Sequence, residues 1–388
     1  MEDRVIHLLS ELVGINSVNP TLSHGPGEQE ISQFVAQYIK GLDLEPEIQP
    51  VAPKRNNVVA IIPGVGRTHP LLFNAHLDTV GVEDMDDPFG LRRSGDRLYG
   101  RGAYDMKGSV AVMLLLAEYL TQHKPPGDVL LTFVVDEEDK SIGTEYLVKK
   151  WLAGIPDRPM GAIFVEPTEE QIAVAHRGFV WYEIEVIGKA AHGSRPTEGI
   201  DAIIPLQAAL EELSKIHAEL SSHEGDPLVG RASLHAGTIE GGTALSVIPS
   251  RSRLRWERRT LPGGSQNDLD VELERVIRAV RNVPGNHQVR GREIFARPPY
   301  AVSDQADIVK CLRAVSPQSK QVGLPFWADS ALTGMAGIPS VLFGPIGLGA
   351  HSREEWVSLK SLIRVYETLK RLIMGFETAQ GKWAGILK

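Results

Sequence analysis

Short apolar runs alternate with longer helical patterns over the first third of the chain, and this order constrains the fold more than any other feature. The runs of strand type cover residues 57–62, 71–75, 129–135 and 162–165. Apolar residues recur with helical spacing at residues 5–13, 31–39 and 108–120. Strands that alternate with helices form a largely parallel sheet, so the sequence predicts an α/β domain with a mostly parallel central sheet.

The pattern changes near Val180, where polar and apolar residues begin to alternate. Alternation typical of strands with one exposed face covers residues 180–186 and 251–259, and helical patterns cover residues 202–220 and 268–280. A buried-strand pattern then returns at residues 340–343. With 388 residues available, we expect two domains. The first would comprise residues 1–177 and 294–388, and the second would be an α+β insertion at residues 178–293.

Composition narrows the choice of partners. Lysine and arginine number 41 and acidic residues 49, and the net charge of −8 argues against nucleic acid. The single cysteine, Cys311, excludes an intrachain disulfide and a cysteine-rich zinc finger. The longest apolar run, residues 110–117, is far shorter than the roughly 20 residues of a membrane span, and the first four residues do not open a signal peptide. We therefore expect a cytoplasmic protein with no membrane partner.

Metal-capable side chains follow almost every predicted strand of the first domain. They are His76 and Asp78 after residues 71–75, Asp136, Glu137 and Glu138 after residues 129–135, Glu166 after residues 162–165, and His351 after residues 340–343. Asp105 lies just before the helix at 108–120. Ligands of open α/β sheets bind at the carboxyl ends of strands, so these groups are predicted to converge. Any one of them alone fits a helix cap or a solvated loop, but their coincidence indicates a metal centre.

Asp78 has a separate expected role beside His76. Residues two apart on a strand share a face, so the Asp78 carboxylate can accept a hydrogen bond from the second ring nitrogen of His76. Such a contact would orient the imidazole without binding the metal.

Five segments, in this order, resemble the M20 metallopeptidases, a family that includes acetylornithine deacetylase, succinyl-diaminopimelate desuccinylase, aminoacylase and carboxypeptidase G. The segments are residues 74–80 (Asn-Ala-His-Leu-Asp-Thr-Val), 100–108, 136–138, 165–168 and 350–352. The resemblance covers nearly the whole chain. It implies a zinc-exopeptidase-like catalytic domain with an inserted lid and dimerisation domain.

The resemblance also implies a site for two zinc ions. Its ligands would be Asp105 bridging both ions, His76 and Glu166 on one, and Glu138 and His351 on the other. Glu137 would be the general base, because a base must stay off the metal to take a proton whereas a ligand must stay on it. Oxygen and imidazole ligands also suit cobalt or manganese. The Asp105–Met106 peptide bond is expected to be cis, as in the family.

The inserted domain carries the residue that the resemblance assigns to the scissile carbonyl. Residues 188–196 look like the family segment whose histidine, here His192, reaches the active site of the partner subunit. A small sheet covered by helices on one face leaves an edge strand that pairing would protect. We therefore expect a homodimer joined through this domain.

A second motif of the inserted domain, at residues 241–249, departs from the family because Ser246 stands where asparagine is usual. Arg259 matches the family arginine that binds the substrate carboxylate, a task suited to a planar bidentate donor. Arg258 occupies a position that is more typically apolar, which leaves a one-place shift of this assignment open.

Together these residues predict metal-dependent hydrolysis of the amide bond of an N-acylated amino acid, with the acetylornithine deacetylase type as first choice. Desuccinylases, carboxypeptidases and dipeptidases of the family share every motif. A dinucleotide-binding protein is a separate alternative, suggested by the glycines at residues 344–349, but their spacing differs from the dinucleotide fingerprint. A non-catalytic binding protein is a further alternative, opposed by the intact Glu137 and ligand positions.

Overall fold

The computed structural model describes residues 1–66, 68–82 and 84–375, which form two compact units. The first unit comprises the described residues of Met1–Val174, of Val302–Val322 and of the chain from Ala328 to residue 375, and the second comprises Ala175–Ala301 and Gly323–Trp327. The second unit extends past the predicted boundary at residue 293 because strand β14 (Gln288–Arg297) continues beyond it. Residues 376–388 of the predicted first domain lie outside the described residues.

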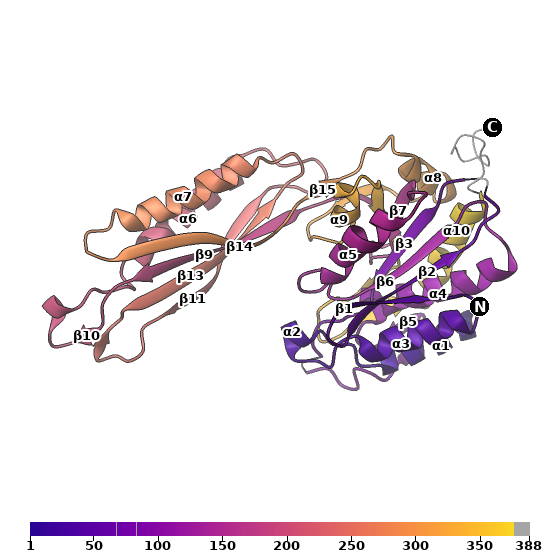
Figure 1. The fold of residues 1–388 in the computed structure, drawn as a ribbon, viewed down its shortest axis with the longest axis horizontal. Helices are drawn as coiled ribbons and strands as arrows, with labels where there is room; N and C mark the ends of the chain where they lie inside the picture. Colours follow the sequence, from indigo (N-terminus) through magenta and orange to yellow (C-terminus); the bar gives the residue numbers. More distant parts are fainter. Residues whose placement is uncertain (67, 83, 376–388) are drawn as a thin grey trace. The chain divides into compact units, whose positions relative to one another are not determined.

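The largest sheet has nine strands and carries the predicted parallel centre (Figure 1). Its order is β1 (Glu47–Ala52), β2 (Arg55–Ile62), β6 (Val129–Val134), β3 (Leu71–His76), β7 (Gly161–Phe164), β17 (Ser340–Leu342), β8 (Ile172–His176) and β15 (Tyr300–Ala301), and β16 (Gln321–Leu324) pairs with β8. The central strands β6, β3, β7 and β17 are parallel, whereas β1, β2 and β15 pair with their neighbours in antiparallel fashion. The predicted α/β class is therefore confirmed.

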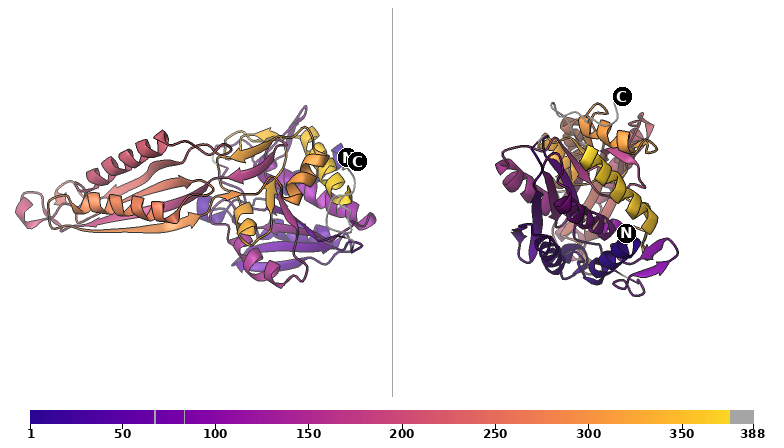
Figure 2. Two further views of the ribbon diagram at one scale, coloured as in Figure 1. Left: turned by 90° about the horizontal axis from the view of Figure 1, so that it is seen from above. Right: turned by 90° about the vertical axis from the view of Figure 1, so that its right-hand side faces the viewer.

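Helices cover this sheet because their apolar faces need a partner surface. The helices that bury the main core are α1 (Glu2–Gly14), α3 (Gln29–Lys40), α4 (Gly108–Gln122), α8 (Asp307–Val315) and α10 (Leu359–Gly375). Figure 2 shows α10 in yellow, and it packs against α4 and α1. Short helices α5 (Ile142–Tyr146) and α9 (Ser330–Met335) contact other strands of the sheet. Among the described residues, no helix combines the length and apolar character that crossing a membrane requires.

The second unit is an antiparallel sheet covered by two helices on one face (Figure 1). Its order is β11 (Ser233–Gly241), β13 (Arg251–Thr260), β9 (Gly178–Ile187) and β14, and the helices are α6 (Leu206–Ser222) and α7 (Gln266–Arg281). Alternate residues of β9 and β13, such as Ile184 and Leu254, point into the core beneath these helices. Helix α6 begins later than predicted from Ala202, because the Asp201 carboxylate accepts the N–H groups of residues 203 and 204 in a turn.

A smaller four-stranded sheet brings distant loops of the first unit together. Its order is β18 (Gly347–Leu348), β19 (Trp356–Ser358), β5 (Arg97–Tyr99) and β4 (Arg92–Ser94). Pairing of β19 with β5 places the loop that follows Tyr99 beside the loop that precedes Trp356. The glycines at residues 344–349 lead into strand β18 rather than a helix, so they lack the structural context of a dinucleotide-binding motif.

Candidate metal centre

The carboxyl ends of neighbouring parallel strands bring the first group of predicted ligands together. His76 is the last residue of β3, and Glu166 lies just after its parallel neighbour β7. Ligand atoms of His76, Asp105 and Glu166 all lie within 4.8 Å of one another. His76 Nε2 is 3.0 Å from Asp105 Oδ1. The sheet order therefore produces the convergence that residue spacing alone only suggested.

A second group shares Asp105 with the first. Ligand atoms of Asp105, Glu138 and His351 also lie within 4.8 Å of one another. His351 Nε2 is 2.8 Å from Glu138 Oε2 and 3.5 Å from Asp105 Oδ2. Glu138 follows β6, and His351 lies in the loop between β18 and β19. Asp105 thus lies between two pairs of candidate ligands, His76 with Glu166 and Glu138 with His351.

Glu355 holds the loop that carries Asp105. Its carboxylate accepts hydrogen bonds from the backbone N–H groups of Gly102, Tyr104 and Asp105, at 2.9, 2.9 and 3.0 Å. It also accepts one from Arg101 Nη1 at 2.7 Å. The Asp105–Met106 peptide bond is cis, which confirms the expectation. Glu355 therefore links the loop before β19 to the loop after β5.

Asp78 contacts His76 through its backbone as well as its carboxylate. His76 Nδ1 lies 2.9 Å from the Asp78 backbone carbonyl oxygen but 3.6 Å from Asp78 Oδ1. The Asp78 carboxylate therefore lies on the His76 side and pairs with its ring, as expected, but the backbone carbonyl is the nearer acceptor. The buried carboxylate also accepts the N–H groups of Glu137 and Glu138, at 3.1 and 3.2 Å. Asp78 thereby positions the turn that carries both glutamates.

Burial and mutual repulsion dominate the electrostatics of the carboxylates. Burial raises the pKa of Glu166 to about 8 and that of Glu138 to about 6, and the charge of Asp105 adds to both shifts. Hydrogen bonds to Asp105 and Glu138 raise the pKa of His351 to about 10. Burial opposes ionisation of Asp105, but hydrogen bonds from His351 and His76 outweigh it and lower the Asp105 pKa. The raised pKa values thus reflect carboxyl groups crowded into a buried site, where a bound cation would offset their mutual repulsion.

The donor set fits divalent cations. Oε1 of Glu138 is buried and has no hydrogen-bond partner among the residues that the structure describes. A buried oxygen of this kind is costly unless a proton or a metal satisfies it. Three carboxylates and two imidazoles are also ligands of the type that zinc and similar ions prefer. The residues present therefore suit a metal centre with Asp105 in a shared position.

Glu137 lies beside the two ligand groups but belongs to neither. Burial raises the pKa of Glu137 well above its ordinary value, and the nearby charge of Glu166 raises it further. A carboxylate with a raised pKa holds a proton more readily at neutral pH. This property suits a group that must both take and return a proton.

His192 lies in the second unit, on strand β10 (Ala191–His192). Its side chain is exposed, and its Nδ1 lies 2.8 Å from Ser194 Oγ. β10 pairs with β12 (Val247–Ile248), and the N–H of Gly193 donates to the Ser246 carbonyl at 2.8 Å. The segments at residues 188–196 and 241–249 are therefore neighbours in space.

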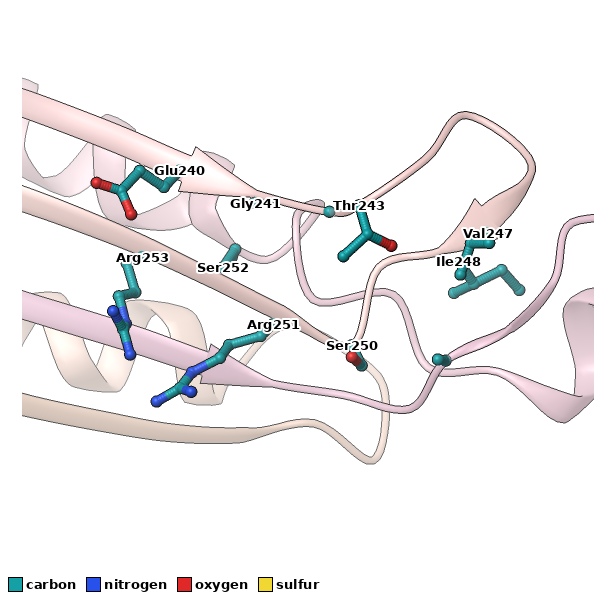
Figure 3. A pocket seen from close by; sticks show the side chains of 11 residues that line it. Glu240, Gly241, Thr243, Val247, Ile248, Ser250, Arg251, Ser252 and Arg253 are labelled. Atoms are coloured by element: carbon teal, nitrogen blue, oxygen red, sulfur yellow. The ribbon is translucent and has the colours of Figure 1, made fainter.

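A surface pocket of the second unit lies beside the same segment (Figure 3). Its lining comes from the end of β11, from β12 and from the start of β13, and includes Gly241, Thr243, Ile248, Ser250 and Arg251. The pocket is thus formed by residues of the second unit rather than by the predicted metal ligands.

Arg258 and Arg259 lie on opposite faces of β13. Arg258 is buried and forms a bidentate ion pair with Glu272 of α7, at 2.8 and 3.1 Å. Arg259 lies on the face without helices, where its Nε donates to Glu257 Oε1 at 2.6 Å. Its guanidinium carbon is 5.4 Å from the ring centre of Phe179. Of the two arginines, only Arg259 is partly exposed and therefore able to meet a ligand.

Comparison with known proteins identifies the family. The sequence profile described as peptidase family M20/M25/M40 matches residues 72–375. The chain belongs to this family. An acetylornithine deacetylase from Buchnera aphidicola subsp. Schizaphis graminum is 26% identical over 383 residues, which cover 96% of this chain and 97% of that protein.

Solved structures of M20 proteins share the fold. The M20 metallo-carboxypeptidase of Sulfolobus solfataricus has a TM-score of 0.74 and 17% identity, covering 95% of this chain and 98% of its own. A dinuclear metal-binding M20 peptidase of Bacillus subtilis has a TM-score of 0.72 and 16% identity, covering 96% and 97%. The resemblance to M20 proteins is therefore confirmed, and this chain is a member of a hydrolase family.

Several residues that organise this M20 site were not found from the sequence. They are Glu355 behind Asp105, and Asn19, Glu28 and Arg55 behind the turn at residues 136–138. None of them lies in a quoted motif or directly after a predicted strand. The only local signal is that Glu355 immediately precedes a strand and lies four residues after His351.

Proposed function

We propose that this protein hydrolyses the amide bond of an N-acylated amino acid in a metal-dependent reaction. The observation that carries the proposal is the pair of ligand groups sharing Asp105, with Glu137 beside them but in neither group. Membership of the M20 family supports hydrolysis as the reaction class.

In this proposal the two ligand groups hold two zinc ions, for which cobalt or manganese can substitute. His76 and Glu166 would complete one site, Glu138 and His351 the other, and Asp105 would bridge them. Two sites are favoured because five ligands exceed the needs of one tetrahedral zinc. When bound, the cations would acidify a water molecule and polarise the substrate carbonyl. The related Bacillus subtilis peptidase, described as dinuclear, supports this stoichiometry.

The protein's own groups would move the proton and orient the substrate. Glu137 would take a proton from the attacking water and return it to the leaving amine. Asp78 would keep Glu137 in place through the backbone hydrogen bond described above. His192 would donate a hydrogen bond to the oxygen of the scissile carbonyl, and Arg259 would bind the substrate carboxylate.

N-acetylornithine is the first choice of substrate, since the Buchnera relative of nearly equal extent is an acetylornithine deacetylase. Such an enzyme would serve amino-acid metabolism, and its cytoplasmic location remains a prediction from the sequence. Desuccinylase, carboxypeptidase and dipeptidase activities are the alternatives, and the metallo-carboxypeptidase of similar fold favours a peptide substrate among them.

We also propose a homodimer joined through strand β11. β11 is an edge of its sheet, and most of its residues are exposed. Ile239 on β11 has an exposed apolar side chain, as do Ile203 and Ile204 in the turn before α6 and Leu210 on α6, which packs beside β11. An exposed edge with an apolar border favours pairing with a second copy. In this dimer, His192 would act on the substrate of the partner subunit.

A hydrolysis screen tests the proposal. Metal-free protein would be reloaded with zinc, cobalt or manganese and assayed with N-acetylornithine, other N-acetyl amino acids, N-succinyl-diaminopimelate and dipeptides. We expect metal-dependent release of amine, with the highest kcat/KM for N-acetylornithine. A preference for N-succinyl or dipeptide substrates would replace this substrate assignment. Stoichiometric metal binding without turnover of any amide would instead support the non-catalytic alternative.

A further inference from the structure

Two buried charged residues that the mechanism does not use lie behind the turn that carries Glu137 and Glu138. Glu28 is fully buried and Arg55 is nearly so. Arg55 Nε donates to Glu28 Oε2 at 2.8 Å, and Arg55 Nη2 donates to the other carboxylate oxygen. Ion pairs removed from water contribute little stability on average, because desolvation offsets much of the attraction. Stability alone therefore does not explain why Glu28 and Arg55 lie beside the turn at residues 136–138.

The Glu28–Arg55 pair holds Asp136 by both its side chain and its backbone. Arg55 Nη1 lies 2.6 Å from Asp136 Oδ1, and the backbone N–H of Asp136 donates to Glu28 Oε1 at 3.2 Å. Asp136 has a φ angle of +68°, a left-handed conformation that aspartate adopts more readily than most residues with side chains. Contacts with its surroundings help to hold it there. Glu28 and Arg55 supply contacts on both sides of this residue.

Asn19 continues the same network to Asp78. Its Nδ2 lies 3.0 Å from Asp136 Oδ1 and 2.8 Å from Asp78 Oδ2. Asp78 in turn accepts the N–H groups of Glu137 and Glu138. A continuous chain of buried hydrogen bonds therefore runs from Glu28 to the backbone of both glutamates.

Arg55 also balances the negative charges of this network. Glu28, Asp78 and Asp136 bring three carboxyl groups into a buried region, and Arg55 is the cation that contacts two of them directly. Loss of the guanidinium would leave these groups to repel each other at the base of the turn. The turn would then be expected to shift or open.

We propose that Glu28 and Arg55 are positioning residues that set the direction of the Glu137 carboxylate through Asp136. This inference rests on the proposed function only for the expected decrease in kcat. The structural part, that the pair orders residues 136–138, stands independently of any substrate. A displacement of about 1 Å at a reacting group can lower a rate by about 100-fold, so a positioning role has a measurable size.

The test uses the full-length, metal-loaded protein with Arg55→Met, Arg55→Lys and Glu28→Gln. Arg55→Met should lower kcat by roughly 10- to 100-fold and change KM by less than about 3-fold, with both metal ions retained. Arg55→Lys should recover only part of the rate, since a single ammonium cannot reproduce contacts from three guanidinium nitrogens. Amide hydrogen exchange of peptides covering residues 134–142 should become faster in Arg55→Met.

Arg275→Met is the matched control. Arg275 also joins two carboxylates, Glu212 and Glu219, but in the second unit between α6 and α7. Arg275 is partly exposed, so this variant should change stability little and leave kcat and the exchange of residues 134–142 unchanged. If Arg55→Met behaves in the same way, the pair is merely structural and the proposal is wrong.

The exchange measurement separates this inference from the proposed function. If the wild-type protein hydrolyses no amide, the proposed function fails. Unchanged protection of residues 134–142 from hydrogen exchange in Arg55→Met would refute the positioning role, whatever the activity. If Arg55→Met does not fold, Glu28→Gln decides, because it keeps the side-chain shape but removes the charge and replaces one acceptor oxygen with an amide NH2 group. Wild-type exchange and kcat in folded Glu28→Gln would then overturn the proposal.

Discussion

At the scale of single residues, adjacent Glu137 and Glu138 are expected to respond differently to the same substitution. Glu137→Gln removes a proton acceptor but no proposed ligand, so turnover should fall by about 100- to 10,000-fold while metal content stays unchanged. Steady-state kinetics and elemental analysis on the same sample would measure both quantities. Activity within a few-fold of wild type would end the general-base assignment.

Glu138→Gln is the matched comparison on the neighbouring side chain. Glu138 contacts His351 and has a buried oxygen without a partner among the described residues. The amide is a weaker metal ligand than the carboxylate, so we expect lower occupancy of one metal site. Full occupancy of both sites in Glu138→Gln would contradict its place in the ligand set.

His176 provides a prediction about pH and stability at the same scale. Burial lowers the pKa of this imidazole to about 4, compared with an ordinary value of 6.5. Between these two pH values the unfolded chain binds more protons than the folded chain, so the free energy of unfolding decreases as pH falls from 6.5 to 4. One pKa unit corresponds to about 1.4 kcal/mol, so this loss can reach about 3 kcal/mol.

Replacement of His176 by phenylalanine would isolate this contribution. The ring lies 6.0 Å from that of Tyr300 and 6.1 Å from that of Trp327, so an aromatic substitute suits the surroundings. Denaturant unfolding at pH 7.5 and pH 4.5 should show a smaller loss of stability in His176→Phe than in wild type. Equal losses in the two proteins would show that His176 does not titrate in this range.

At the scale of elements, the pairing of β19 with β5 gives Glu355 control over the loop that carries Asp105. Glu355→Ala would remove the acceptor of three backbone N–H groups and of Arg101. Loss of such supporting contacts typically weakens metal binding by about 10- to 100-fold. Competition with a chelator would measure the change in affinity. The exposed neighbour Glu354→Ala is the control, and equal affinities in the two variants would refute the role of Glu355.

The edge strand β11 allows a second test at this scale. Ile239→Lys places a charge on the exposed edge that we propose to pair in the dimer. Sedimentation analysis should show a shift from dimer to monomer. Val271→Lys changes an equally exposed residue on α7 and should leave the dimer intact. A dimer that persists in Ile239→Lys would move the interface away from β11.

At the scale of the whole molecule, mixing two inactive variants tests whether His192 acts in the partner's site. His192→Ala subunits retain Glu137, and Glu137→Gln subunits retain His192. Random exchange in an equal mixture makes about half the dimers mixed, with one competent site each, so about a quarter of wild-type activity should return. No recovery after verified subunit exchange would show that His192 acts within its own subunit or not at all.

Local patterns in the sequence were sufficient for the elements that the main sheet requires. Residues 71–75 and 129–135 form strands because their apolar side chains are buried on both faces, and residues 108–120 form a helix because the run is too long for a strand. Strands β11 and β14 were not predicted, because most residues of β11 and half of those of β14 are exposed and their apolar signal is weak. Edge strands depend on pairing with a neighbour more than on their own sequence.

The sequence by itself determined the α/β class, the family and the chemical types available at the strand ends, because these follow from local periodicity and short motifs. Only the tertiary structure decided how those groups meet. The parallel order of β6, β3 and β7 brings Glu138, His76 and Glu166 to one edge of the sheet. The buried supports, Glu28 and Arg55, lie far from Asp136 in sequence, and hydrogen bonds between distant residues leave no local pattern. The types of residue at the site can therefore be predicted from the sequence. The orientation of their side chains, and the residues that hydrogen-bond to them, depend on packing in three dimensions.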